Sequence, residues 1–134
     1  MKQPNDWTFL PETIGGLEPL GSFTRQGDEA WTRLVKWVHY AMVAGEVFGI
    51  SKTNVDQIKS STKDPETRRF LGLDGDFGKL LGVDNDWAYR IIKLVGNYGE
   101  VFERNVGSKT PLKLDRGINA LWTKGGLMYA MPFR

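Results

Sequence analysis

Apolar residues recur at three- and four-residue intervals after Gly27, the spacing that places them on one face of a helix. Asp28 suits the N-cap position of this helix, and Gly49 marks its end. The apolar stripe consists of Trp31, Leu34, Val35, Val38 and Met42. We therefore predict a helix over residues 28–48 with one apolar face that packs against a partner.

A second stripe with helical spacing lies in the stretch from Asp86 to Gly107. It consists of Trp87, Ile91, Leu94, Val95, Tyr98 and Phe102. Asp84 or Asn85 is expected to cap this helix. Gly96 and Gly99 each weaken it by about 1 kcal/mol relative to alanine, and a glycine tolerated there marks close packing or a kink. We predict one long helix that ends at the final glycine of this stretch.

Shorter patterns fill the remaining stretches. Residues 7–26 combine aromatic residues and threonine with glycine and proline, which predicts an extended segment that forms an edge strand or a crossing connection. Thr53 is expected to cap one short helix, and Asp64 with Pro65 to begin another. A last helix is predicted over residues 114–124. The chain is therefore predicted to be mostly α-helical, with a short extended or β segment at its N-terminus.

Composition narrows the class of protein further. The 134 residues include 40% apolar residues and five tryptophans, enough for the core of one domain. The absence of cysteine excludes disulfides and thiolate metal sites, and the lone histidine excludes multi-histidine metal sites. No stretch of eighteen apolar residues occurs, so we expect no membrane insertion.

Charge is unevenly distributed, although the formal net charge is only +2. Residues 104–134 carry six basic side chains and one acidic side chain. Such a segment suits either binding to phosphate or anionic lipid, or an ordinary solvated surface. Its basic residues are spread out and are not interleaved with stacking aromatic residues, which favours the solvated surface. We expect no nucleic-acid partner.

Residues that could perform chemistry lack the partners that this chemistry needs. His39 has no orienting carboxylate or nucleophile at a suggestive spacing. The pairs Asp74/Asp76 and Asp84/Asp86 resemble the start of calcium-binding loops, but neither pair is followed by the closing glutamate. Helix caps and turns explain these aspartates better. We therefore expect no catalytic residue, no metal site and no cofactor, and we do not expect an enzyme.

Longer stretches of the chain resemble a known protein family. The segment EPLGSFTRQGDEAWTRLVKWVHYAMVAGE resembles the return segment of periplasmic amino-acid-binding proteins, in which a strand crosses back from the second lobe and enters a helix. Three further segments look like the C-terminal part of general L-amino-acid-binding proteins of ABC transporters: NVDQI, RRFLGLDGDFGKLLGVDNDWAYRIIKLVGNYGEVFERNVG and PLKLDRGINALWTKGGLMYA. The resemblance covers about residues 7–134 and departs slightly in the final MPFR.

This resemblance implies a two-lobed α/β fold that closes on a free amino acid, in proteins more than twice as long as this chain. It implies that the arginine and the aspartate that hold the ligand lie in parts of those proteins that this chain does not match, so no ligand-binding residue is carried over. Four residues match the second hinge strand, namely Glu18, Pro19, Leu20 and Gly21. We accordingly divide this single domain into a hinge-like crossing segment (1–26) and the helical C-terminal region of lobe one (27–134).

The resemblance predicts a truncated substrate-binding component of an amino-acid ABC transporter, which acts with an ABC permease and does not bind ligand on its own. The alternative is a helical interaction or dimerisation module that complements another half-protein or has a new partner. Since no sheet for the helices is visible in the sequence, we expect a homodimer, with residues 7–25 exchanged between chains. The family implies a periplasmic location, whereas the lack of a signal-peptide pattern predicts a cytoplasmic one for the chain as written.

Overall fold

The computed structural model describes residues 19–133, and within this range the chain is helical. Its elements are α1 (Glu29–Val47), α2 (Val55–Ser61), α3 (Pro65–Phe70), α4 (Phe77–Leu81), α5 (Trp87–Leu94), α6 (Tyr98–Asn105) and two short 3-10 helices, η2 (Gly117–Asn119) and η3 (Trp122–Lys124). No strand is assigned in this range, and an isolated parallel bridge joins Leu121 to Met128. The prediction of a mostly helical chain is confirmed for these residues. The predicted β segment is not seen over residues 19–26, and the rest of it lies outside the described range.

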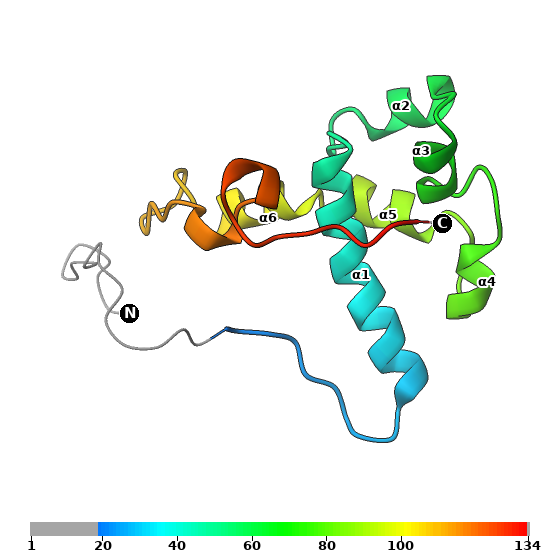
Figure 1. The fold of residues 1–134 in the computed structure, drawn as a ribbon, viewed down its shortest axis with the longest axis horizontal. Coiled ribbons are helices and arrows are strands. Elements are labelled where there is room, and N and C mark those ends of the chain that lie inside the picture. Colours follow the sequence, from blue (N-terminus) through cyan, green and yellow to red (C-terminus); the bar gives the residue numbers. More distant parts are fainter. Residues whose placement is uncertain (1–18, 134) are drawn as a thin grey trace.

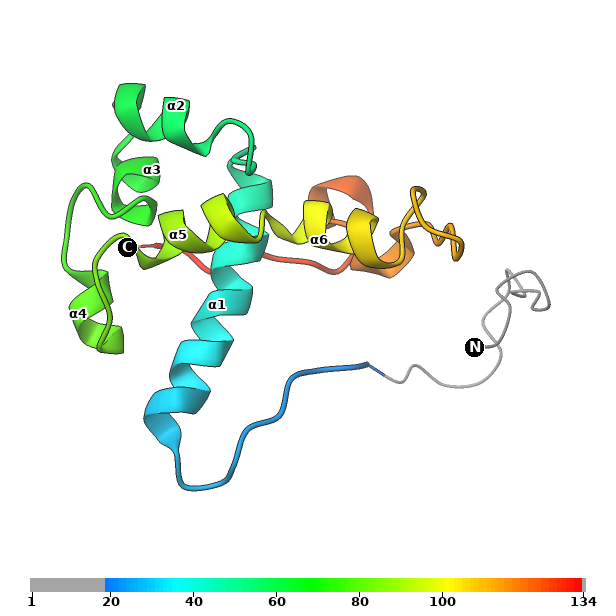
Figure 2. The same cartoon turned by 180° about the vertical axis from the view of Figure 1, so that it is seen from behind.

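Helix α1 is the axis on which the other elements are arranged (Figure 1). Two opposite views agree that α5 and α6 cross α1 on one side and that the C-terminal segment crosses it on the other (Figures 1 and 2). Both views also show that the N-terminal half of α1 extends away from these crossings. The C-terminal half of α1 is therefore enclosed by neighbouring segments, whereas its N-terminal half projects.

Local sequence signals set the ends of α1 and α3 as predicted. The carboxylate of Asp28 accepts a hydrogen bond from the Trp31 backbone N–H at 3.0 Å, which caps α1. The helix ends before Gly49, whose φ of +66° suits glycine. Asp64 caps α3 in the same way, and Pro65 occupies its first turn. These predictions are confirmed.

The prediction of one long helix after Asp86 is wrong, because α5 and α6 are separate helices. Gly96 adopts φ +97°, and Asn97 is extended with φ −76° and ψ 173°. The Asn97 side chain accepts a hydrogen bond from the Glu100 N–H at 2.9 Å, and the Glu100 carboxylate accepts one from the Asn97 N–H at 2.8 Å. This reciprocal capping box begins α6 afresh and is the physical reason for the break.

Three further boundaries differ from the predictions. The helix predicted over residues 114–124 is replaced by η2 and η3, since Gly117 has φ +47° and Ala120 is extended. Helix α2 follows Asn54 rather than Thr53, and it has no side-chain cap. Helix α4 is not among the predicted helices. Each difference falls on a short element, for which local propensity is a weak guide.

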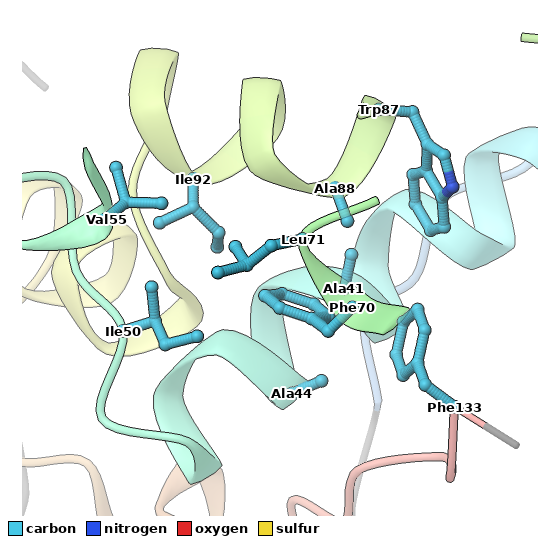
Figure 3. Packing of buried hydrophobic residues seen from close by; sticks show 10 residues of the cluster. All are labelled: Ala41, Ala44, Ile50, Val55, Phe70, Leu71, Trp87, Ala88, Ile92 and Phe133. Carbon is cyan, nitrogen blue, oxygen red and sulfur yellow. The ribbon is translucent and has the colours of Figure 1, made fainter. Parts of the chain in front are cut away.

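The core lies where the C-terminal half of α1 meets α3, α5 and the end of the chain (Figure 3). Its fully buried large side chains include Ile50, Val55, Phe70, Leu71, Ile92 and Phe133. The Phe133 ring meets the Phe70 ring edge-on at 5.1 Å between centroids and stacks on the Trp87 ring at 6.1 Å. Arg69 Nε donates to the Phe133 carbonyl at 3.0 Å. The chain end is therefore part of the core.

Candidate interaction surface

Helix α1 carries two apolar faces, and the described residues cover one of them fully. Ala41 and Ala44 are fully buried in the core, with Trp37 packed beside them. The apolar stripe found in the sequence, which we call the α1 outer face, lies roughly a third of a turn away at 100° per residue. At its N-terminal end Trp31 is 54% exposed, while Leu34 is half-buried. Val35, Val38 and Met42 are also partly buried, so within residues 19–133 the stripe is partly covered and only Trp31 is exposed.

Two surface grooves flank the α1 outer face. The first, which we call the strand groove, lies between α1 and residues 20–24 and has a volume of about 710 Å³. Its lining includes Leu20, Gly21, Thr24, Val35, His39 and Tyr98. The second lies between α1 and the start of α5, with a volume of about 450 Å³, and Leu34, Val38 and Ile91 line it. The outer face is therefore a ridge between two largely apolar hollows.

Residues 19–24 form the outer wall of the strand groove. Leu20 and Phe23 are 100% and 96% exposed, although both are large and apolar. The Thr24 hydroxyl is hydrogen-bonded to the Thr32 hydroxyl at 2.6 Å, which joins this wall to α1. No backbone hydrogen bond links residues 19–24 to any other described segment. Within the described residues, this wall therefore combines exposed apolar side chains with a backbone that makes no hydrogen bond to another segment.

The hinge-like residues predicted from the sequence fall in this wall. Leu20 and Gly21 line the strand groove, and Pro19 is exposed at the start of the described range. Glu18 lies outside the described residues. The structure therefore places Leu20 and Gly21 beside α1, and the role of the four residues as a hinge strand remains a prediction.

A half-buried ion pair fixes the rest of the chain to α1. The Arg116 guanidinium donates to both carboxylate oxygens of Glu46 at 3.1 and 2.9 Å, with side-chain exposures of 19% and 10%. It also donates to the Asn119 carbonyl at 2.9 Å and lies 5.3 Å from the ring centres of Tyr98 and Phe102. One side chain thus joins α1, α6 and the C-terminal segment. The sequence analysis missed this pair because its members are 70 residues apart.

Gly99 leaves room for this ion pair. A Cβ atom at Gly99 would lie 2.9 Å from an Arg116 nitrogen and 3.0 Å from the Glu46 carboxyl carbon. Both distances are too short for ordinary packing, so a side chain there would displace the pair. The interpretation that a glycine in this helix marks close packing is confirmed at this position.

A polar cluster on the molecular surface joins α2 to α5. The Asp56 carboxylate accepts hydrogen bonds from Lys93 and, at 2.9 Å, from the Tyr89 hydroxyl. The Lys93 bond, followed by the Tyr89 bond, holds the pKa of Asp56 below its usual value. The Lys59 ammonium lies 3.6 Å from the Tyr89 ring centre. Because these groups are solvated, the cluster orients the two helices and contributes little stability.

The other candidate residues have structural roles. His39 is exposed on α1, with its ring 5.6 Å from that of Tyr98. Asp74 pairs with Arg68, and Asp86 is the N-cap residue of α5 and accepts from Arg90 at 2.9 Å. Within residues 19–133, no cluster of three or more potential metal ligands occurs. None of the described helices is long and apolar enough to cross a membrane.

Comparison with known proteins identifies close relatives. The glutamate/glutamine/aspartate/asparagine-binding protein of Rhodobacter capsulatus is 55% identical over 96% of this chain, which corresponds to 38% of that protein. The general L-amino acid-binding periplasmic protein of Rhizobium johnstonii is 52% identical over 100% of this chain and 39% of that protein. No protein-family model matches the chain.

A solved structure supports the same assignment. A periplasmic binding protein of an ABC transporter from Brucella ovis, with glutathione bound, matches 82% of this chain and 35% of that chain. The TM-score is 0.78 and the sequence identity is 51%. The chain thus spans less than two-fifths of the length of the relatives that it matches. Along nearly all of its length the chain is therefore similar to the C-terminal portion of amino-acid-binding periplasmic proteins of ABC transporters.

Proposed function

We propose that this chain supplies the helical C-terminal region of lobe one to an amino-acid-binding protein of an ABC importer. Residues 27–134 are this region, and residues 1–26 are the segment that crosses from the second lobe. The complete protein would act in the periplasm and deliver amino acids to a membrane permease. The observation that carries this proposal is the α1 outer face, an apolar stripe only partly covered within residues 19–133, in a chain that spans 38–39% of its relatives.

The 134 residues alone are not expected to bind free amino acids. A zwitterionic ligand needs counter-charges and hydrogen bonds for its carboxylate and its ammonium, in a site that excludes water. The strand groove is lined by Lys36 and His39 but by no carboxylate among the described residues, so it offers no counter-charge to an ammonium group. We therefore expect dissociation constants weaker than about 1 mM, equivalent to about 4 kcal/mol of binding free energy.

Titration calorimetry with a panel of L-amino acids tests this expectation. The full-length Rhizobium johnstonii relative is titrated with the same panel as a control. It checks the quality of the ligands and the sensitivity of the calorimetry. Heats indistinguishable from dilution for the 134-residue chain are expected. A micromolar isotherm for any amino acid would refute the proposal that the ligand site needs the rest of the protein.

A second candidate function is that of a dimerisation module. The exposed apolar surface of α1 favours it, because soluble proteins rarely leave large apolar patches uncovered. In this arrangement two copies cover each other's α1 outer face, with residues 7–25 exchanged between them.

A further inference from the structure

A small cavity lies where α4, the start of α5 and the chain end meet α1 (Figures 1 and 2). It has a volume of about 200 Å³, and we call it the aromatic cavity. We propose that it binds a small molecule with one aromatic ring and one carboxylate, the ring held among aromatic side chains and the carboxylate held by Arg33. This inference goes beyond the proposed function and does not depend on it.

Aromatic rings form much of the cavity wall. Trp37, Phe77, Trp87 and Phe133 all line it. The Phe133 ring stacks on the Trp87 ring at 6.1 Å between centroids (Figure 3), and it meets the Trp37 and Phe77 rings edge-on at 5.6 and 6.5 Å. Phe133 and Trp87 are buried, so this part of the wall is held in place by the core. Because aromatic rings pack well in stacked and edge-on arrangements, the wall favours an aromatic occupant.

The volume of the cavity limits the occupant to one ring. A cavity of about 150 Å³ lined by apolar side chains is large enough to bind benzene. The aromatic cavity is slightly larger, so it accommodates a six-membered ring with a short substituent. Leu80 is 67% exposed and Arg33 is exposed as well, so the substituent can lie at the solvent boundary beside these two residues.

The charge at the cavity selects the substituent. Among the lining residues Arg33 carries a positive charge, and no carboxylate lines the cavity within the described part of the chain. Glu29 lies one turn before Arg33 on α1, yet none of the ion pairs between described residues involves Arg33. A guanidinium donates two parallel hydrogen bonds to a carboxylate, whereas an ammonium group here would lack a counter-charge. The lining therefore favours a simple carboxylate over a zwitterion.

The aromatic cavity and the α1 outer face lie on different sides of α1. Trp37 packs against the core, and Arg33 precedes it by four residues on the same side of the helix. At 100° per residue, Trp31 and Leu34 of the outer face are directed about 100° or more away from Arg33. Association through the outer face is therefore compatible with binding in the cavity.

Three compounds of similar shape test the proposed ligand class. The first is 3-phenylpropanoate, the second is L-phenylalanine, which adds an ammonium group, and the third is 3-phenylpropan-1-ol, which has a hydroxyl in place of the carboxylate. Calorimetry on the 134-residue chain should give a dissociation constant below about 1 mM for 3-phenylpropanoate, and values at least about tenfold weaker for the other two. Equal affinities for the three, or no saturable binding of 3-phenylpropanoate, would overturn the proposal.

Indole N–H signals in nuclear magnetic resonance spectra locate the bound ring. In the isotope-labelled chain, 3-phenylpropanoate should shift the signals of Trp37 and Trp87, which line the cavity. It should leave the signal of Trp122, which is 58% exposed and does not line the cavity. Replacing each tryptophan in turn by phenylalanine assigns the signals. Shifts confined to Trp122, or equal shifts of all three signals, would place the ligand elsewhere and overturn the proposal.

Two exposed leucines provide a matched pair of charge variants. Leu80→Asp places a carboxylate beside the cavity, so it should weaken binding of 3-phenylpropanoate by about tenfold through charge repulsion. Leu94→Asp adds the same charge at an α5 position that is 72% exposed and does not line the cavity, and it should change the affinity by less than about twofold. Both positions are exposed, so both variants should fold. Equal effects would contradict binding in the cavity.

Arg33→Met tests the partner of the carboxylate. It removes the guanidinium and keeps an unbranched side chain at an exposed position. It should weaken binding of 3-phenylpropanoate by about tenfold and change the affinity for 3-phenylpropan-1-ol by less than about twofold. An unchanged affinity for 3-phenylpropanoate, in a variant with the far-UV circular dichroism of the original chain, would overturn the role of Arg33.

Discussion

Phe133 shows how much of this core depends on one side chain at the end of the sequence. It is 2% exposed and contacts the aromatic rings of α1, α3, α4 and α5. Phe133→Ala should therefore lower the free energy of unfolding by about 3–5 kcal/mol. Leu127→Ala, at a residue that is 69% exposed, should change it by less than about 0.5 kcal/mol. Urea denaturation followed by far-UV circular dichroism measures both, and equal stabilities would show that the chain end is not part of the core.

The role of Phe133 could not be predicted from the sequence. The final residues have no helical or alternating pattern, so no local signal distinguishes a core residue there from a frayed terminus. Asp28 and Asp64 behaved differently, because a cap acts within three residues of itself. Residue roles that depend on near neighbours were therefore predictable, and those that depend on distant ones were not.

The Arg116–Glu46 pair makes a second prediction at this scale. Removing one partner from a half-buried, bidentate pair leaves an uncompensated charge, so Glu46→Gln and Arg116→Met should each cost about 3 kcal/mol of unfolding free energy. The double variant should cost clearly less than the sum of the two. Asp74→Asn breaks the more exposed Arg68–Asp74 pair and should cost less than about 1 kcal/mol. If the changes in unfolding free energy of the two single variants simply add in the double variant, measured by urea denaturation, the two side chains are not coupled.

At the scale of elements, the break between α5 and α6 depends on Asn97. Its side chain closes the capping box, and its amide nitrogen donates to the buried Ile50 carbonyl at 2.9 Å. Asn97→Ala removes the cap and leaves a buried acceptor without a partner, at a combined cost of about 2–4 kcal/mol. Asn105→Ala loses a hydrogen bond at an exposed position and should cost less than about 1 kcal/mol. In chemical denaturation, the midpoint should fall much further for Asn97→Ala than for Asn105→Ala. Similar midpoints would mean that Asn97 does not stabilise this junction.

The same junction shows where element prediction succeeded and failed. The apolar spacing across residues 87–102 continues through the break, so periodicity alone predicted one helix. The sequence did contain the opposing signal, since Asn97 with Glu100 is a capping-box pattern directly after Gly96. Helix α1 gave the complementary result, because its limits were predicted but its buried face was not. Periodicity locates an apolar face, whereas the neighbouring segments decide which face is enclosed.

At the scale of the whole molecule, the helical body has its own core, while a second apolar face of α1 is only partly covered within residues 19–133. The first property follows from the contacts of Phe70, Trp87 and Phe133 with the C-terminal half of α1. The second follows from the exposure of Trp31 and the grooves on either side of it. A folded unit with a partly covered apolar face is expected to associate, and the remainder of the relatives and a second copy are the two competing covers.

The partly covered α1 outer face leads to a prediction about self-association of the chain. The 134-residue chain on its own should form a homodimer that dissociates on dilution. Leu34→Asp, on the α1 outer face, should shift the mass measured by light scattering toward that of the monomer. Leu94→Asp, outside both grooves, should leave the mass unchanged. A monomer at every concentration would show that α1 tolerates water without a partner, whereas a dimer insensitive to Leu34→Asp would locate self-association on another surface.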